Sequence, residues 1–162
     1  MKTLLACPEC AQGTHGVVNF FAETIRQDGV YTGKCPNGHD LLIATQTLPH
    51  EMLFEIALNA IGDGYYREAV SSFAASVERF YEFSIRVLAR NRKVAPSAVG
   101  AAWKHVAAKS ERQLGAYVFL YVVSFGESPS LVDGERTKLR SDVIHKGLLP
   151  EKNDATRYGA AA

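Results

Sequence analysis

The sequence has no long apolar run, few cysteines and no surplus of either charge. None of its apolar runs approaches the roughly 18 residues that a bilayer-spanning helix needs, so we expect no membrane helix. The 18 basic and 17 acidic residues leave a net charge of +1. That balance argues against a strongly basic nucleic-acid coat and against an acidic tail protein. With only three cysteines, a chain of 162 residues can still bury a core without disulfide staples.

The first seven residues, MKTLLAC, end like a lipoprotein processing site. A secretory leader needs about 7–15 apolar residues after its basic start. Only Leu4, Leu5 and Ala6 stand there. We therefore expect no export, and a reducing, cytoplasmic setting.

The composition changes near residue 48. Residues 1–48 contain all three cysteines and five of the 13 glycines, and they show little helical periodicity. Turn residues bound short β-prone runs at 17–21, 29–33 and 40–44, which predict strands. This part lacks the apolar mass for an independent core, so something else must hold it together.

Residues 49–162 predict an all-helical bundle. Helices are expected over 50–61, 65–92, 97–108, 111–125 and 135–145, with the first turns of another over 150–157. In 65–92 apolar residues recur every three or four positions, which is typical of one helix face. The run 116–123 is apolar all round, so we expect its helix to lie centrally in the bundle.

All three cysteines fall into two short knuckles. Cys7 and Cys10 form a Cys-x2-Cys pair, and Cys35 and His39 form a Cys-x3-His pair after 24 intervening residues. Two tight turns that each present two soft ligands suit a tetrahedral Zn²⁺. The sequence therefore predicts one Zn²⁺ per chain, bound by these four residues. His15 is a rival to His39 as the fourth ligand.

Residues 5–46 resemble a zinc ribbon, in which two knuckles are carried on β-hairpins. Four protein ligands leave no open position on the metal, so its expected role is structural. Zinc binding would supply the folding energy that the small core lacks. Because this part has no basic stripe, its own affinity for phosphates should be modest.

A second candidate site lies in residues 138–147, KLRSDVIHKG. Arg140 and His145 are separated by four residues, and Lys138 and Lys146 flank them. The guanidinium of arginine is permanently charged and can donate two parallel hydrogen bonds to a phosphate. Histidine can accept and donate protons near neutral pH. Together they could cleave an RNA phosphodiester through its 2′-hydroxyl without a metal. On spacing alone, the pattern favours a helix end whose charges are solvated and complement the helix dipole, because an isolated Arg-x4-His is very common.

In this helical context, residues 50–157 resemble a HEPN domain. Such domains carry an Arg-x(4–6)-His motif near their last core helix, which Arg140 and His145 match. The stretch 143–147, VIHKG, looks like the family's usual ending, and 67–83 is similar to the first long helix of bacterial members. Many members are metal-independent ribonucleases of toxin–antitoxin, abortive-infection or CRISPR-linked systems, and they usually dimerise to form one composite cleft. Other members lack activity and bind nucleotides or partners.

The resemblance implies that Arg140 neutralises the scissile phosphate and that His145 transfers protons. The further residues expected to contribute to substrate binding are Lys138, Ser141, Lys146 and Glu78. Position 141 departs from the family, where Asn or Asp is frequent. The implied partners are RNA, a second copy of the chain, and a regulator or antitoxin protein.

Acidic and basic residues on the longest predicted helix have two interpretations each. Glu78 and Glu82 stand at i and i+4 on one face, where they could orient Arg140 or form solvated pairs with neighbouring arginines. A cluster near the end of the helix comprises Arg86, Arg90, Arg92 and Lys93. It either complements the helix dipole or forms a path for an RNA backbone.

The expected architecture is a small β zinc ribbon over residues 1–48, followed by an all-α, HEPN-like bundle over 49–162. The fold class is α+β overall and mostly helical. The expected function is a metal-independent endoribonuclease of a bacterial defence or toxin-type system. The alternative is a non-catalytic module that binds nucleic acid, a nucleotide or a partner protein.

Overall fold

The computed structural model describes residues 2–12, 20–26 and 28–162, and it divides the chain into two compact units. The first is Met1–Leu48 and the second is Pro49–Ala162. The division falls where the composition changes.

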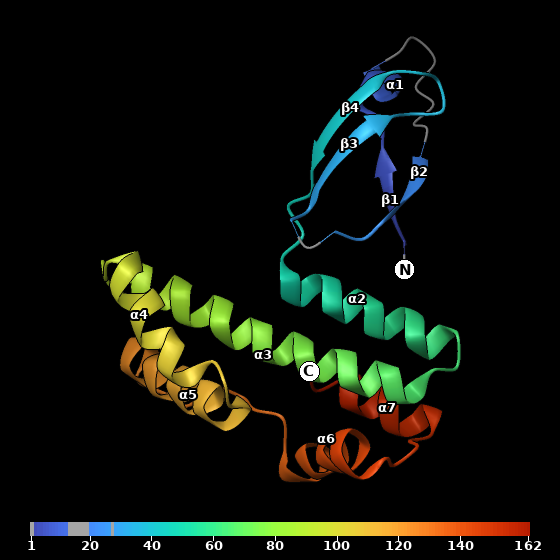
Figure 1. The fold of residues 1–162 in the computed structure, drawn as a ribbon. Helices are drawn as coiled ribbons and strands as arrows, with labels where there is room; N and C mark the ends of the chain where they lie inside the picture. Colours follow the sequence, from blue (N-terminus) through green and yellow to red (C-terminus); the bar gives the residue numbers. More distant parts are fainter. Residues whose placement is uncertain (1, 13–19, 27) are drawn as a thin grey trace. The chain divides into compact units, whose positions relative to one another are not determined.

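The first unit contains two antiparallel strand pairs. Strand β1 (Lys2–Ala6) pairs with β2 (Phe20–Thr24), and β3 (Val30–Lys34) pairs with β4 (Asp40–Ala44) (Figure 1). A short helix, α1 (Pro8–Gln12), follows β1. The largest buried cluster of this unit consists of Cys7, Cys35 and Leu41, against which Cys10, Phe21 and Ile43 pack. Sulfur therefore takes the place that aliphatic side chains occupy in a larger core.

Two of the three predicted strands coincide with β3 and β4. The predicted strand at 17–21 lies partly outside the described residues, and its last two residues begin β2. Strand β1 was not predicted, because its residues were considered only as a possible secretory leader and not as a strand. Leu5 is its buried residue, and β1 pairs along its whole length with β2.

The second unit is helical, and the expected fold class is confirmed. Its helices are α2 (Pro49–Gly62), α3 (Tyr66–Asn91), α4 (Pro96–Val106), α5 (Ser110–Phe125), α6 (Gly134–Lys146) and α7 (Lys152–Gly159). Each predicted helix begins and ends within two residues of the observed one.

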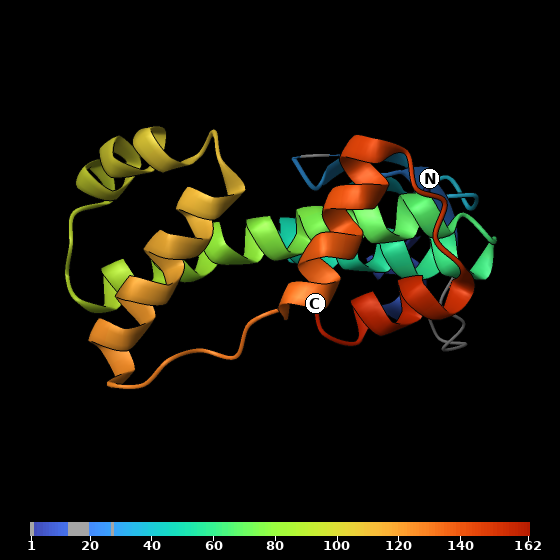
Figure 2. The same cartoon turned by 90° about the horizontal axis from the view of Figure 1, so that it is seen from below.

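Helix α3 links two separate core clusters of this unit. Its first half packs against α2, α6 and α7, and its second half against α4 and α5 (Figures 1 and 2). The first cluster comprises Ala57, Ala69, Val70, Phe73, Ala74, Val143, Ala155 and Tyr158. The second is built on Tyr81, Ile85 and Tyr117, with Trp103 and Leu114 among the residues packed against it.

The expectation that α5 lies centrally is wrong. Phe119 is 74% exposed, and Val122, Val123 and Phe125 are also exposed. Only Gln113 and Tyr117 of this helix are buried. Because α5 packs mainly on α3 and α4, these apolar side chains stay largely uncovered in the described part of the chain. Apolarity along the whole circumference therefore does not mean burial here, and an exposed face of this kind is typical of interaction surfaces.

Tyr158 leads to a prediction about alkaline unfolding. Burial raises the pKa of Tyr158 from 10.0 to about 12. A folded-state pKa above the unfolded one gives stabilisation that is complete below pH 10.0 and is lost as the pH rises through about 12. We expect Tyr158→Phe to raise the pH midpoint of alkaline unfolding, followed by circular dichroism. The exposed Tyr65 provides the control, since Tyr65→Phe should leave the midpoint unchanged. An unchanged midpoint in Tyr158→Phe would contradict the prediction.

Candidate functional site

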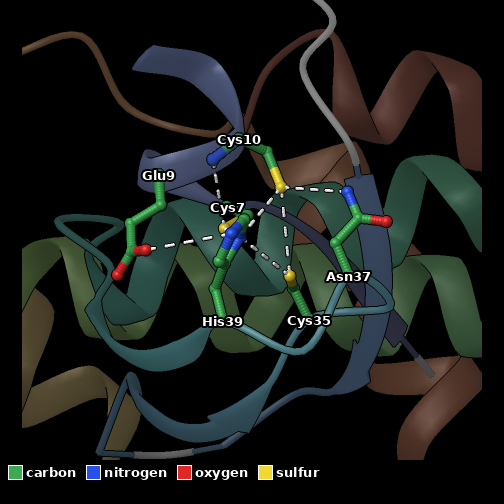
Figure 3. Close-up of polar contacts among 6 residues, drawn as sticks. All are labelled: Cys7, Glu9, Cys10, Cys35, Asn37 and His39. Carbon is green, nitrogen blue, oxygen red and sulfur yellow. Dashed lines mark hydrogen bonds and ion pairs between the residues drawn. The ribbon is translucent and has the colours of Figure 1, made fainter. Parts of the chain in front are cut away.

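The two knuckles of the first unit converge on one point. The ligand atoms of Cys7, Cys10, Cys35 and His39 all lie within 4.8 Å of one another (Figure 3). Cys7 follows β1 and Cys10 lies in α1, whereas Cys35 and His39 lie in the turn between β3 and β4. Each strand pair therefore contributes two side chains, and the four residues form a candidate metal site. The rival ligand His15 lies outside the described residues.

The second knuckle is a tight turn closed by backbone hydrogen bonds. The N–H of Gly38 donates to the carbonyl of Cys35 at 2.8 Å, and the N–H of Cys35 donates to the carbonyl of His39 at 3.0 Å. Gly38 has φ +86°, a left-handed conformation that glycine adopts at little cost. This turn directs the side chains of Cys35 and His39 toward the same side.

The imidazole of His39 faces the three sulfurs with one nitrogen. Its Nδ1 lies 3.3 Å from the Sγ of Cys10, 3.5 Å from that of Cys35 and 3.7 Å from that of Cys7. Its Nε2 lies 3.9 Å from a carboxylate oxygen of Glu9 (Figure 3). Nδ1 is therefore the candidate ligand atom, and Glu9 is placed to orient the ring from the opposite side.

Two further hydrogen bonds reach the sulfurs. The backbone N–H of Cys10 donates to the Sγ of Cys7 at 3.5 Å, and the amide Nδ2 of Asn37 donates to the Sγ of Cys10 at 3.3 Å. Such donors stabilise thiolates. Glu9 and Asn37 were not among the residues predicted from the sequence. Their positions inside Cys-Pro-Glu-Cys and Cys-Pro-Asn-Gly-His could have indicated them, because residues between ligands lie near the metal.

Protonation opposes metal binding at these residues. Burial raises the pKa of the Cys7 thiol, and the hydrogen bond with the Cys10 side chain raises the pKa of His39. A metal needs thiolates and a neutral imidazole. Metal binding at this cluster therefore displaces protons, and its affinity should fall as the pH falls.

In the second unit, α6 carries the Arg-x4-His motif. The side chain of Asp133 caps the start of α6 by accepting the N–H of Arg136 at 2.9 Å. The Gly147 residue, with φ 72°, ends the helix after His145 and Lys146. The motif therefore occupies a helix with well-defined ends.

Arg140 is paired with an acidic residue of α3. Its Nη2 donates to the Oε1 of Glu78 at 2.5 Å, and the two side chains are 22% and 25% exposed. Glu82 instead pairs with Arg79 and Arg86, each at 2.7 Å. Of the two acidic residues on this face, Glu78 is the one that orients Arg140.

His145 does not lie beside Arg140 in one chain. It is exposed in the last turn of α6. Five helical positions correspond to a rotation of about 500°, so the two side chains leave the helix about 140° apart. Arg140 points toward α3, and His145 therefore points to a different side.

The remaining candidates are spread along α6. Lys138 is exposed and lines a shallow pocket of about 200 Å³ together with Arg136 and Arg157. Lys146 pairs with Asp142 at 2.6 Å, and this ion pair lowers the pKa of the Asp142 carboxyl. Ser141 is half-buried. These residues share a helix but do not form one closed site.

Comparison of the chain with protein-family models, curated proteins and solved structures finds no match. Within the described ranges, no helix has both the length and the hydropathy that are needed to cross a membrane. The resemblance to HEPN domains therefore stays a prediction based on the motif and the helical pattern.

Proposed function

We propose that this chain is an endoribonuclease that acts as a homodimer in a defence or toxin-type system. In this proposal a zinc ion stabilises the first unit, and the cleavage reaction itself uses no metal. What supports the proposal is the placement of the Arg-x4-His motif on a capped helix. Glu78 holds Arg140 at one side of α6, and His145 is exposed in its last turn. The zinc and the catalytic motif belong to different units and are argued separately.

Four-coordinate Zn²⁺ fits the dimensions of the cysteine–histidine cluster. Zinc–sulfur bonds of about 2.3 Å and zinc–nitrogen bonds of about 2.0–2.1 Å imply tetrahedral edges of about 3.8 Å between sulfurs and about 3.6 Å between sulfur and nitrogen. The Sγ atoms of Cys10 and Cys35 are 3.9 Å apart, the three sulfur–nitrogen distances lie between 3.3 and 3.7 Å, and all four ligand atoms lie within 4.8 Å of one another. Three sulfurs and one imidazole favour zinc over the oxygen-seeking cations. With four protein ligands the ion is structural and takes no part in the proposed cleavage.

In the proposed reaction, His145 accepts the proton of an RNA 2′-hydroxyl. The 2′-oxygen then attacks the adjacent phosphorus while Arg140 compensates the developing negative charge. The bond to the 5′-oxygen breaks, and that oxygen receives a proton from a protonated His145 side chain. The products carry a 2′,3′-cyclic phosphate and a 5′-hydroxyl. Because the two side chains of one copy diverge around α6, the proposed cleft combines residues from both copies.

The test is RNA cleavage by wild type, Arg140→Ala and His145→Ala without added metal ions, because excess chelator would also remove the proposed structural zinc. Removal of a general acid–base group lowers rates about 10²- to 10⁴-fold, and we expect a loss in that range for His145→Ala. His105 is also an exposed histidine, on α4, so His105→Ala is the matched control and should cleave like wild type. Equal cleavage by wild type and His145→Ala would exclude the proposed site. A monomer in light scattering at micromolar concentration would exclude the composite cleft.

The second candidate is a non-catalytic module that binds a nucleotide, nucleic acid or a partner protein. The observation that favours it is the divergence of Arg140 and His145 around α6, because one copy alone then presents no assembled catalytic pair. Binding of RNA or a nucleotide without any turnover, in a dimer that retains its zinc, would favour this candidate over the first.

A further inference from the structure

One end of the helical unit is strongly basic although the whole chain is nearly neutral. Between Glu82 and Glu111 the sequence has no acidic residue. It has six basic ones, which are Arg86, Arg90, Arg92, Lys93, Lys104 and Lys109. This segment covers the last turns of α3, the following turn and all of α4.

An apolar groove of about 310 Å³ runs along this basic end. Its floor is apolar, with Phe83 and Val87 from α3 and Val99 from α4. Arg86 and Arg90 stand at its edge. Val87 is 47% exposed and Phe83 is 37% exposed, so the groove is open to solvent at these residues. Open grooves of this kind suit an elongated polypeptide better than a small molecule, which is usually enclosed on most sides.

A second apolar cleft, of about 240 Å³, continues from the groove between α4 and α5. The two share Val94 and Val99, and Trp103 lines the second. Helix α4 has no fully buried residue although it carries these large apolar side chains. Since helices of this length gain most of their stability from packing, α4 is incompletely covered within this chain.

The charges at the edge are arranged to receive an acid. Arg86 already pairs with Glu82, but no acidic side chain of the described residues lies within ion-pair distance of Arg90. Lys93 has φ +60°, a strained conformation for a residue other than glycine, and it directs the chain so that Val94 borders both cavities. An unpaired arginine beside an apolar floor is complementary to a partner that is apolar on one face and acidic at its margin.

We propose that this groove docks an acidic amphipathic helix of a partner protein. Apolar side chains spaced three or four residues apart would lie on Phe83, Val87 and Val99, and one would enter the cleft beside Trp103. Carboxylates at the edge of the helix would pair with Arg90. RNA fits less well, because the lining is mainly aliphatic and offers few aromatic surfaces for bases. The proposal does not depend on the ribonuclease activity.

The experiment uses the full-length protein and a display library of helical peptides about 16 residues long with randomised surface positions. Enriched peptides are expected to combine an i, i+3, i+4, i+7 apolar stripe with flanking Asp or Glu. Their affinities are then measured by fluorescence anisotropy, and the emission of Trp103, the only tryptophan, should shift on binding. We expect Arg90→Glu and Val87→Asp each to weaken binding at least about 10-fold. Replacement of the peptide's acids by lysine should restore binding to Arg90→Glu.

Matched controls lie away from the groove. Leu58 is an exposed apolar residue of α2, and Lys152 is an exposed cation of α7. Leu58→Asp and Lys152→Glu should bind the peptides like wild type, and circular dichroism verifies that all four variants are folded. The proposal would be overturned if no peptide is enriched, or if the enriched peptides lack acidic residues. It would also be overturned if Arg90→Glu binds the enriched peptides as tightly as wild type. A different ligand would overturn it as well. This would be the outcome if no acidic peptide is enriched and the protein instead binds RNA or anionic phosphatidylglycerol vesicles, with that binding abolished in Arg90→Glu.

Discussion

Replacement of Cys10 by serine is expected to abolish metal binding and to unfold the first unit. The buried cluster of that unit consists of two candidate ligand cysteines and one leucine, which is too little apolar surface to offset chain entropy. Structural zinc supplies an apparent free energy of about 10–16 kcal/mol in zinc-finger peptides, and that energy is also folding energy. The second unit has its own core clusters and should remain helical. Metal analysis should fall from about one zinc per chain to near zero, and amide NMR signals of residues 2–48 should collapse to unfolded positions.

Asn37→Ala is the graded control for this prediction. Its amide donates to the Sγ of Cys10 without being a ligand itself, so the variant should retain zinc with an affinity about 10- to 100-fold lower. Full retention of zinc by Cys10→Ser would mean that the ligand set is wrong. Loss of zinc in His15→Ala with retention in His39→Ala would assign the fourth ligand to His15.

The spacing of the cysteines and His39 was sufficient to predict which residues converge at the candidate metal site. Two metal ligands that are only a few residues apart lie in one tight turn. Cys-x2-Cys and Cys-x3-His spacings therefore predict which side chains lie close together in space. Hydrogen bonding around the site depends on side-chain direction, which spacing does not encode. Glu9 and Asn37 therefore emerged only from the structure.

The Arg-x4-His motif shows the opposite case. A spacing of five positions on a helix places two side chains on different faces, so the motif by itself does not define a site within one chain. Pairing of Arg140 with Glu78 joins residues 62 positions apart, and the sequence offered Glu82 as an equal candidate. Only the packing of α6 on α3 distinguishes the two.

Helix limits were predictable because Gly and Pro residues mark them, as Gly147 and Pro96 do. Burial was less predictable. The apolar α5 exposes Phe119, whereas Phe73, in a mixed segment of α3, is fully buried. Hydrophobicity sets which residues can be buried, but the number of neighbouring elements decides which ones are.

Phe73 is the residue of the helical unit whose truncation should cost most stability. Its ring is fully buried and contacts Phe54 of α2, with ring centroids 5.0 Å apart, and Tyr158 of α7 at 6.5 Å. Truncation of a buried phenylalanine to alanine typically costs about 3–5 kcal/mol, because apolar contacts are lost and a cavity remains. Domains of this size are stable by only about 5–15 kcal/mol. Phe73→Ala should therefore shift the denaturant midpoint of the helical unit strongly, as measured by urea unfolding at 222 nm. Phe119→Ala makes the same chemical change at an exposed site and should stay within about 0.5 kcal/mol of wild type.

Gly159 allows the packing around Phe73 to be tested in the opposite direction. A Cβ atom at position 159 would overlap the Phe73 ring, and α7 can approach α3 this closely because the residue there is glycine. Gly159→Ala should therefore destabilise the wild type by about 1–3 kcal/mol, despite the better helix propensity of alanine. In the Phe73→Ala background the overlap is gone and the added methyl group enters the cavity, so the same substitution should be neutral or stabilising. A double-mutant cycle that finds the two effects simply additive would show that Gly159 and Phe73 do not share the contact on which the packing of α7 depends.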